Sequence, residues 1–272
     1  MRIMTNAWAM IHRETGEIKE LDSVNKRNAG YKEKLAKDNR NGRSRDFMNG
    51  NMQYLHEVYS VLTTPQSGYL MLLQCYVGWD NGIIVNPDKT PMTTSDMQRV
   101  LQLTGSKRST FYDFFRSCVA NNIVIANEDG SYSMNERYHF KGAHKNQFVV
   151  KTYTAKIKRV YKEVKANDIG LIYRMLPYVH MSTNALCADP YEKDPKKIRW
   201  FTQEELAEAI GVDARTLRRR LPKMQFDSEY VIHRGKVGNE PERYTLNYEV
   251  FYRQDNEPDA TLQAMFSASS RD

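Results

Sequence analysis

The feature of this sequence that most restricts its fold is a segment that occurs twice. The stretch Gly68-Tyr-Leu-Met-Leu-Leu-Gln-Cys-Tyr-Val77 is matched 102 positions later by Gly170-Leu-Ile-Tyr-Arg-Met-Leu-Pro-Tyr-Val179. Glycine, tyrosine and valine coincide, and the positions between them are mostly apolar in both copies, as in a buried helix. Such a repeat predicts that one supersecondary unit is used twice.

A second predicted helix follows each copy and begins at a threonine. The two starts are Thr93-Thr-Ser-Asp96 and Thr202-Gln-Glu-Glu205. An acid three residues after a threonine is the capping-box pattern, in which both side chains accept hydrogen bonds from backbone N–H groups at a helix start. In both copies apolar residues follow at the fourth, seventh and eighth positions, so we expect a helix at each place.

A turn and a third helix are predicted next. In the second copy Gly211 supplies a positive φ, Asp213 caps the third helix, and Leu217 and Leu221 point inward one turn apart before Pro222 ends the helix. Two short helices joined by such a turn are typical of a helix-turn-helix. In the first copy we expect Ser106 to be the cap, after a turn about two residues longer.

Each third helix is followed by a candidate β-hairpin. The first covers 123–134, where the pair Asp129-Gly130 favours a tight turn, and the second covers 230–248 with a Gly/Lys-rich tip at 234–238. The order of these elements predicts a mainly α protein with small β-hairpins, built as tandem winged helix-turn-helix domains joined by a basic helix.

The predicted domain boundaries follow from this order. We expect an N-terminal β-hairpin at 1–21, a polar connector at 22–46, a first winged-helix domain at 47–142, a basic linker helix at 143–165, a second winged-helix domain at 166–253 and a flexible tail at 254–272.

Composition excludes several classes of protein. The chain has no run of about 18 apolar residues, which argues against a membrane span, and its start lacks the apolar core of a secretory signal. Its three cysteines, Cys75, Cys118 and Cys187, are scattered, which favours reduced thiols in a cytoplasm over disulfides or a zinc site.

Positive charge is concentrated at 141–165. This segment holds eight Lys or Arg residues and one acid, Glu163, a local excess that equals the chain's formal net charge of +7. Apolar residues recur at helical spacing from Tyr153, and three basic residues fall outside that face: Lys156, Arg159 and Lys162. Either the helix is a solvated connector, or these side chains contact the phosphates of a nucleic acid.

The predicted third helices carry the candidate base contacts. In the second copy the exposed positions are Ala214, Arg215, Arg218 and Arg219. Arginine can donate two hydrogen bonds to guanine, which favours base recognition in the major groove, although arginines on a helix surface can also be merely solvated. In the first copy the candidates are Lys107, Arg108, Ser109 and Tyr112. At the second hairpin the candidate phosphate or minor-groove contacts are Arg234, Lys236 and Arg243, whereas the first hairpin tip, Glu128-Asp129, has the wrong sign for that role.

The sequence contains no motif that indicates catalysis. It lacks a P-loop, a G-x-G-x-x-G loop and an H-E-x-x-H pair, and His139 and His144 lie five residues apart in a basic segment. We therefore predict no enzyme activity, no cofactor and no metal. A tyrosine-dependent nicking enzyme remains a minor alternative.

The second half resembles a known class of proteins. The residues that carry the resemblance are Leu176-Pro-Tyr-Val-His180, the Pro190, Lys193 and Pro195 stretch, and Phe201-Thr-Gln-Glu-Glu-Leu206. They are similar to winged-helix replication and regulatory proteins of firmicute plasmids and phages, of the RepL type. The resemblance covers about 150–253, with an echo over 50–140, and Arg215, Arg218 and Arg219 match its recognition-helix positions by type.

The resemblance implies a protein of the bacterial cytoplasm that binds an origin or operator and recruits replication or transcription machinery. Together with the charge pattern it predicts a sequence-specific double-stranded DNA-binding protein of a phage or plasmid, acting in replication initiation or transcriptional regulation. Whether it forms a homodimer stays open. The alternative is a winged-helix interaction factor that binds a polymerase or a host protein.

Overall fold

The computed structural model describes residues 9–11, 18–20, 46–79, 81–142, 148–194, 196–226, 229–236, 242–254 and 257–268. The chain divides into two compact units, Met1–Arg45 and Asp46–Asp272. In the first unit, β1 (Ala9–Ile11) and β2 (Ile18–Glu20) pair antiparallel within the segment where the sequence predicts a hairpin. The predicted connector at 22–46 lies outside the described residues, except for Asp46.

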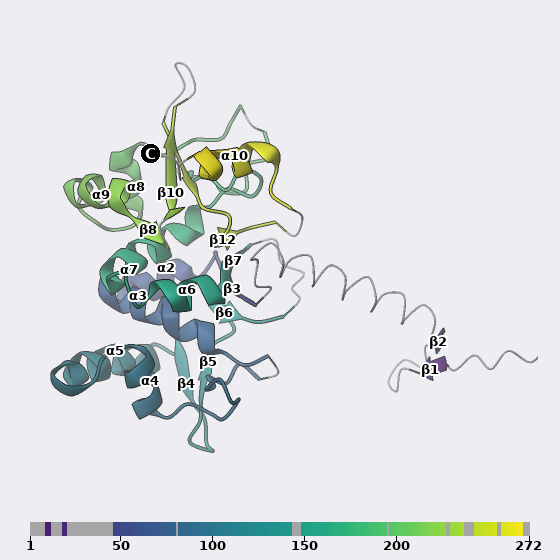
Figure 1. Ribbon diagram of the computed structural model, residues 1–272, viewed down its shortest axis with the longest axis vertical. Helices are drawn as coiled ribbons and strands as arrows, with labels where there is room; N and C mark the ends of the chain where they lie inside the picture. The colour runs from purple at the N-terminus through teal and green to yellow at the C-terminus, as the bar shows by residue number, and fades with distance from the viewer. Residues whose placement is uncertain are drawn as a thin grey trace, which may run out of the picture. The chain divides into compact units, whose positions relative to one another are not determined.

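The second unit contains the remaining described helices and strands (Figure 1). Its α-helices are α2 (Leu55–Val61), α3 (Thr64–Leu73), α4 (Thr94–Val100), α5 (Arg108–Ala120), α6 (Thr154–Val160), α7 (Ala166–Met175), α8 (Gln203–Ala209), α9 (Ala214–Arg220) and α10 (Ala260–Ala268). Its strands are β3 (Phe47–Asn51), β4 (Val124–Ala126), β5 (Tyr132–Met134), β6 (His139–Phe140), β7 (Val149–Tyr153), β8 (Gln225–Phe226), β9 (Glu229–Tyr230), β10 (Ile232–Gly235), β11 (Arg243–Leu246) and β12 (Phe251–Tyr252).

Helices α3 and α7, which hold the two copies of the repeated segment, pack directly against each other at the centre of this unit. They cross at the repeat's glycines: a Cβ on Gly68 would lie 1.9 Å from the carbonyl oxygen of Ala166, and a Cβ on Gly170 would lie 1.8 Å from that of Thr64. The contact is reciprocal, because Thr64 and Ala166 also occupy equivalent places in the two copies. Only glycine allows the two backbones to approach so closely.

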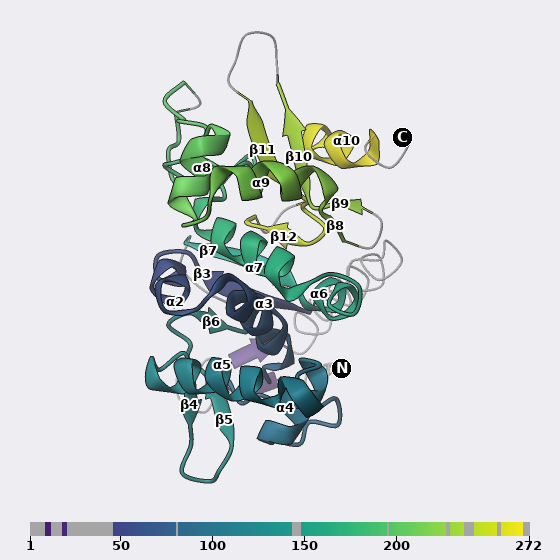
Figure 2. The ribbon, with the colours of Figure 1, turned by 90° about the vertical axis from the view of Figure 1, so that its left-hand side faces the viewer.

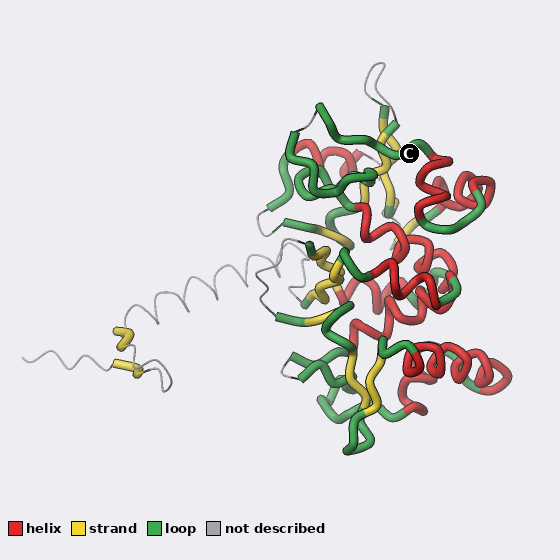
Figure 3. The backbone as a smooth tube through the Cα atoms, turned by 180° about the vertical axis from the view of Figure 1, so that it is seen from behind, coloured by secondary structure: helices red, strands yellow, loops and turns green. Residues whose placement is uncertain are grey.

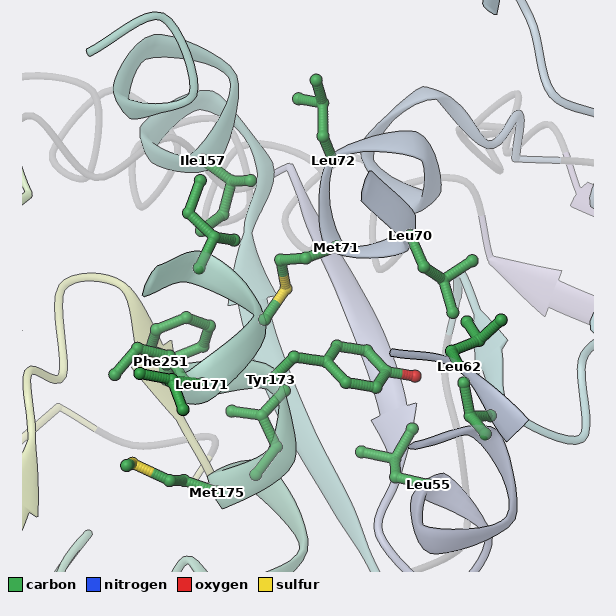
Figure 4. Packing of buried hydrophobic residues seen from close by; sticks show 14 of the residues in the cluster. Leu55, Leu62, Leu70, Met71, Leu72, Ile157, Leu171, Tyr173, Met175 and Phe251 are labelled. Atoms are coloured by element: carbon green, nitrogen blue, oxygen red, sulfur yellow. The ribbon is translucent and has the colours of Figure 1, made fainter. Parts of the chain in front are cut away.

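A four-stranded antiparallel sheet lies beside this helix pair, with the order β12-β7-β3-β6. Helices α3, α6 and α7 lie on one side of it (Figures 1 and 3). Side chains from both halves of the chain meet there: Leu55 and Met71 lie near Tyr173 and Phe251 in one buried cluster (Figure 4). The core therefore runs through both halves without a break.

These contacts correct the predicted fold class. The described residues form nine α-helices and five small antiparallel sheets, a mixed α and β fold. The expected mainly α architecture of tandem winged helix-turn-helix domains joined by a basic helix is wrong, because α3 and α7 share one core and the four-stranded sheet takes strands from both halves. The predicted linker helix also differs: its described residues form strand β7 and the short helix α6, whose Ile157 and Val160 are fully buried.

Many local features do match the sequence patterns. Both capping boxes form, with the backbone N–H groups of Asp96 and Glu205 donating to the hydroxyls of Thr93 and Thr202 at 3.2 Å. Gly211 has a φ of +67°. Strands β4 and β5 pair around the predicted Asp-Gly turn, and β10 pairs with β11.

Two local predictions fail. Ser106 does not cap α5, because residues 105–107 form a 3-10 turn and no side chain caps the helix that begins at Arg108. Part of the segment expected to be a flexible tail forms α10, and its Leu262 is buried against a small cluster that includes Tyr248 and Tyr252.

The buried Arg174 of α7 ties the ends of two helices together. Its guanidinium donates hydrogen bonds to the carbonyl oxygens of Tyr59 and Leu62 at the end of α2, at 3.3 and 2.7 Å, and to that of Ile210 at the end of α8, at 3.1 Å. A cation is favourable at helix C-termini because their last carbonyl groups are unpaired and carry partial negative charge. Arg174 thus joins the first half of the chain to the second.

The described part of the chain contains no helix both long and apolar enough to cross a membrane. All three cysteines are free thiols buried in the core.

Candidate nucleic-acid interface

Helix α9 presents three arginines to solvent. The Asp213 carboxylate accepts a hydrogen bond from the backbone N–H of Thr216 at 3.0 Å, which fixes the start of the helix, and Leu217 anchors it in the core. The anchor leaves Arg215, Arg218 and Arg219 exposed, while Ala214 is half-buried. Of the four predicted contact residues of this helix, the three arginines therefore lie on its accessible surface, and Ala214 is partly covered.

Acidic side chains compensate some of this charge but not all of it. Arg218 meets Glu204 of α8 at 3.0 Å, yet both side chains are about two-thirds exposed (67% and 64%). The ion pair is therefore weak, and another anion can replace Glu204 at the Arg218 guanidinium. Arg220 pairs with Asp168 in the first turn of α7. Within the described residues, Arg215 and Arg219 have no ionic partner.

A cleft of about 410 Å³ opens beside α9, between the end of that helix and the start of α7. Four cationic and two acidic residues line it: Lys165, Arg219, Arg220, Lys223, Glu163 and Asp168. Because Asp168 is held by Arg220, the cleft keeps a positive excess next to the exposed arginines. Lys165 and Lys223 were not predicted as site residues, because only tertiary packing brings the α6–α7 turn to the end of α9.

The second hairpin adds two accessible cations. Lys236 and Arg234 are both exposed, and Arg234 also meets Glu242, the residue before β11, at 2.6 Å. Arg243 lies over the ring of Trp200, 4.6 Å from its centroid. The tip itself, 237–241, lies outside the described residues.

The predicted contacts of the first half lie at the start of α5. Lys107, Arg108 and Ser109 are exposed. Tyr112 is half-buried, and its hydroxyl accepts hydrogen bonds from Arg108 at 3.4 Å and from Gln98 at 3.3 Å, which lowers the pKa of the phenol. Helices α5 and α9 lie at opposite ends of the second unit but on the same side of the α3–α7 pair (Figures 1 and 2).

Several lysines of the basic segment interact with other parts of the chain and are not available at a binding surface. Lys141 pairs with Asp46 at 2.7 Å, and the Lys151 ammonium donates to the carbonyl oxygen of Gln254 at 2.7 Å. Lys156, a predicted phosphate contact, is only 10% exposed and meets Glu229 at 2.7 Å. Of the three residues predicted here, Arg159 and Lys162 lie at the surface.

No group of three or more His, Cys, Asp or Glu residues in the described part of the chain is placed to hold a metal ion. Of the histidines that the structure describes, two are buried: His139 forms a hydrogen bond with the Tyr173 hydroxyl at 2.8 Å, and His180 forms one with the carbonyl oxygen of Glu192, also at 2.8 Å. Comparison of the chain with protein-family models, with curated proteins and with solved structures finds no match.

Proposed function

We propose that this protein binds double-stranded DNA through the exposed arginines of α9 and the basic cleft beside that helix. The observation that carries the proposal is the accessible pair Arg215 and Arg219 on a helix pinned by Leu217 and Asp213. Arginines on a helix fixed in this way suit a phosphate or a guanine edge, because the planar guanidinium can donate two parallel hydrogen bonds to either.

A second contact is expected at the start of α5. Lys107 and Arg108 are exposed at the start of α5, and α5 lies on the same side of the second unit as α9 (Figure 2), so we expect one duplex lying along that side to meet both helices. The acidic tip at Glu128-Asp129 makes this end the weaker of the two, and we assign sequence discrimination to α9.

The biological role that fits best is replication initiation or transcriptional regulation for a phage or plasmid in a bacterial host. This part of the proposal is supported by the resemblance of 150–253 to plasmid and phage replication proteins. Such a role requires a preferred DNA site, so the proposal also requires sequence selectivity.

The test is selection of duplexes from a randomised library, followed by anisotropy titration of the preferred site at fixed salt. We expect Arg215→Ala and Arg219→Ala each to weaken binding about tenfold, as for the loss of one charged hydrogen-bonding partner. Lys197→Ala is the matched control, since Lys197 is 72% exposed and lies outside the proposed interface.

Two results would contradict the proposal. One is a library in which no site is enriched and no duplex binds. The other is a loss of affinity in the arginine variants no larger than that of Lys197→Ala.

A further inference from the structure

A second cavity, of about 420 Å³, lies in the first half of the second unit. Its lining includes Tyr76, Trp79 and Lys89 from the segment that follows α3, together with Asp46, Lys141 and Lys158. Neither the proposed α9 interface nor the α5 contact includes these residues.

Two aromatic rings in this pocket are paired with lysines. The Lys158 ammonium lies 4.2 Å from the centroid of the Tyr76 ring, and the Lys141 ammonium lies 5.3 Å from that of Trp79. Trp79 is 59% exposed, the most exposed large apolar side chain among the described residues. Exposure of an indole in a cationic pocket offers a flat surface on which a planar ring can stack.

The charges in the pocket are not balanced. The Asp46 carboxylate is held by Lys141 at 2.7 Å and by the Thr154 hydroxyl at 2.6 Å, so it accounts for one of the lysines. Lys158 is half-buried and has no carboxylate within ion-pair distance among the described residues, and burial lowers the pKa of its ammonium group. Lys89 adds a further cation to the lining. A partly desolvated ammonium without a counter-ion is a favourable place for an anion.

We propose that this pocket binds a nucleoside phosphate, with the base stacked on Trp79 and the phosphate held by Lys158. The volume suits a ligand of this size, since small-molecule sites usually measure a few hundred Å³. Stacking of a base on an aromatic ring and pairing of the phosphate with a cation are the interactions by which proteins hold single-stranded nucleic acids without sequence preference. The nucleotide is either free or the unpaired end of a DNA strand, and both share this chemistry.

The experiment is a titration of the full chain with four probes: dAMP, deoxyadenosine, inorganic phosphate and a 5′-phosphorylated four-residue deoxyadenosine strand. Intrinsic tryptophan fluorescence and calorimetry report binding. We expect quenching by dAMP or by the strand, and at least tenfold weaker binding of deoxyadenosine, which lacks the phosphate. If dAMP binds more tightly than the strand, the ligand of the pocket is a free nucleotide. If the strand binds more tightly, the ligand is the end of a DNA strand.

Three variants locate the site. Trp200→Phe keeps the quenching, whereas Trp79→Phe removes it. Lys158→Gln weakens binding tenfold or more by calorimetry, whereas the control Lys197→Gln changes it less than twofold. The proposal is overturned if neither dAMP nor the strand binds, or if Lys158→Gln behaves like its control.

Nucleotide binding by this pocket and duplex binding by α9 are tested separately. We expect Arg215→Ala and Arg219→Ala to affect only the duplex titration, and Lys158→Gln to affect only the nucleotide titration. Failure of one proposal is therefore distinguishable from failure of the other.

Discussion

Gly68 of α3 and Gly170 of α7 lie at one helix crossing, each against the backbone of the other's helix. The same two glycines align in the sequence repeat. Their conservation between the two copies therefore has a steric cause: the crossing needs a residue without a Cβ on both helices.

The first prediction concerns this crossing. Gly68→Ala or Gly170→Ala places a methyl group within 2 Å of a carbonyl oxygen, so the two helices must separate. We expect a loss of about 3 kcal/mol or more in the free energy of unfolding, measured with urea. Gly50→Ala is the control, because its nearest neighbour would be a leucine methyl at 3.4 Å, and it should cost no more than about 1 kcal/mol. Equal losses in all three variants would refute the steric explanation.

The second prediction concerns Arg174. Replacing it with methionine leaves three carbonyl groups without a donor at the ends of α2 and α8, at about 1 kcal/mol each, so we expect a loss near 3 kcal/mol in thermal or urea unfolding. Arg116→Met is the control, since Arg116 is 76% exposed and lies 3.8 Å from its acidic partner, and its effect should stay within about 0.5 kcal/mol. A smaller loss for Arg174→Met than for Arg116→Met would show that the buried hydrogen bonds contribute nothing net.

The third prediction concerns pH. Burial lowers the pKa of His139 to about 3, below the value of about 6.5 for an unfolded chain. The unfolded state therefore binds the proton first as pH falls, and stability decreases from about pH 6.5 downward. By pH 5 this residue alone should cost about 2 kcal/mol relative to pH 7.5.

Urea unfolding of His139→Phe at both pH values tests that expectation. Burial also lowers the pKa values of His180 and His233, so the wild-type chain should lose still more stability over this range. The variant should show a shallower pH dependence than the wild-type protein. An identical slope would mean that His139 is protonated in the fold.

The fourth prediction concerns salt. If Arg219 contacts a phosphate, its removal should reduce the slope of log affinity against log salt concentration by about 0.9, the change for one contact on duplex DNA. The measurement is anisotropy at four or more salt concentrations. Lys156→Gln should leave the slope unchanged, because Lys156 is paired with Glu229 and nearly buried. A slope change in Lys156→Gln but not in Arg219→Ala would place the phosphate contacts elsewhere.

Local structure could be predicted well because its determinants are close together in sequence. The capping boxes at Thr93 and Thr202, the turn at Gly211 and the cap at Asp213 each involve residues within three or four positions. The exposed arginines of α9 follow from the same local pattern, since one buried leucine, Leu217, fixes which face of the helix is inward.

The overall fold could not be predicted because it depends on contacts between distant residues. Strand β3 reads Phe-Met-Asn-Gly-Asn, without the alternation of a half-buried strand, and its partners β6 and β7 lie about ninety residues or more away. The interactions of the basic segment depend on distant residues too, because in the fold a carbonyl group holds Lys151 and a carboxylate holds Lys156. The pocket around Trp79 has no recognisable sequence motif, because its lining residues, from Asp46 to Lys158, are far apart in the sequence.

The reciprocal approach of α3 and α7 limits how the chain can be dissected. A fragment ending before Ala166 would expose the surface of α3 around Gly68 to water, and a fragment beginning there would expose the matching surface of α7 around Gly170. We expect neither half to fold stably when it is expressed alone. The DNA and nucleotide sites are therefore best separated by single substitutions in the intact polypeptide.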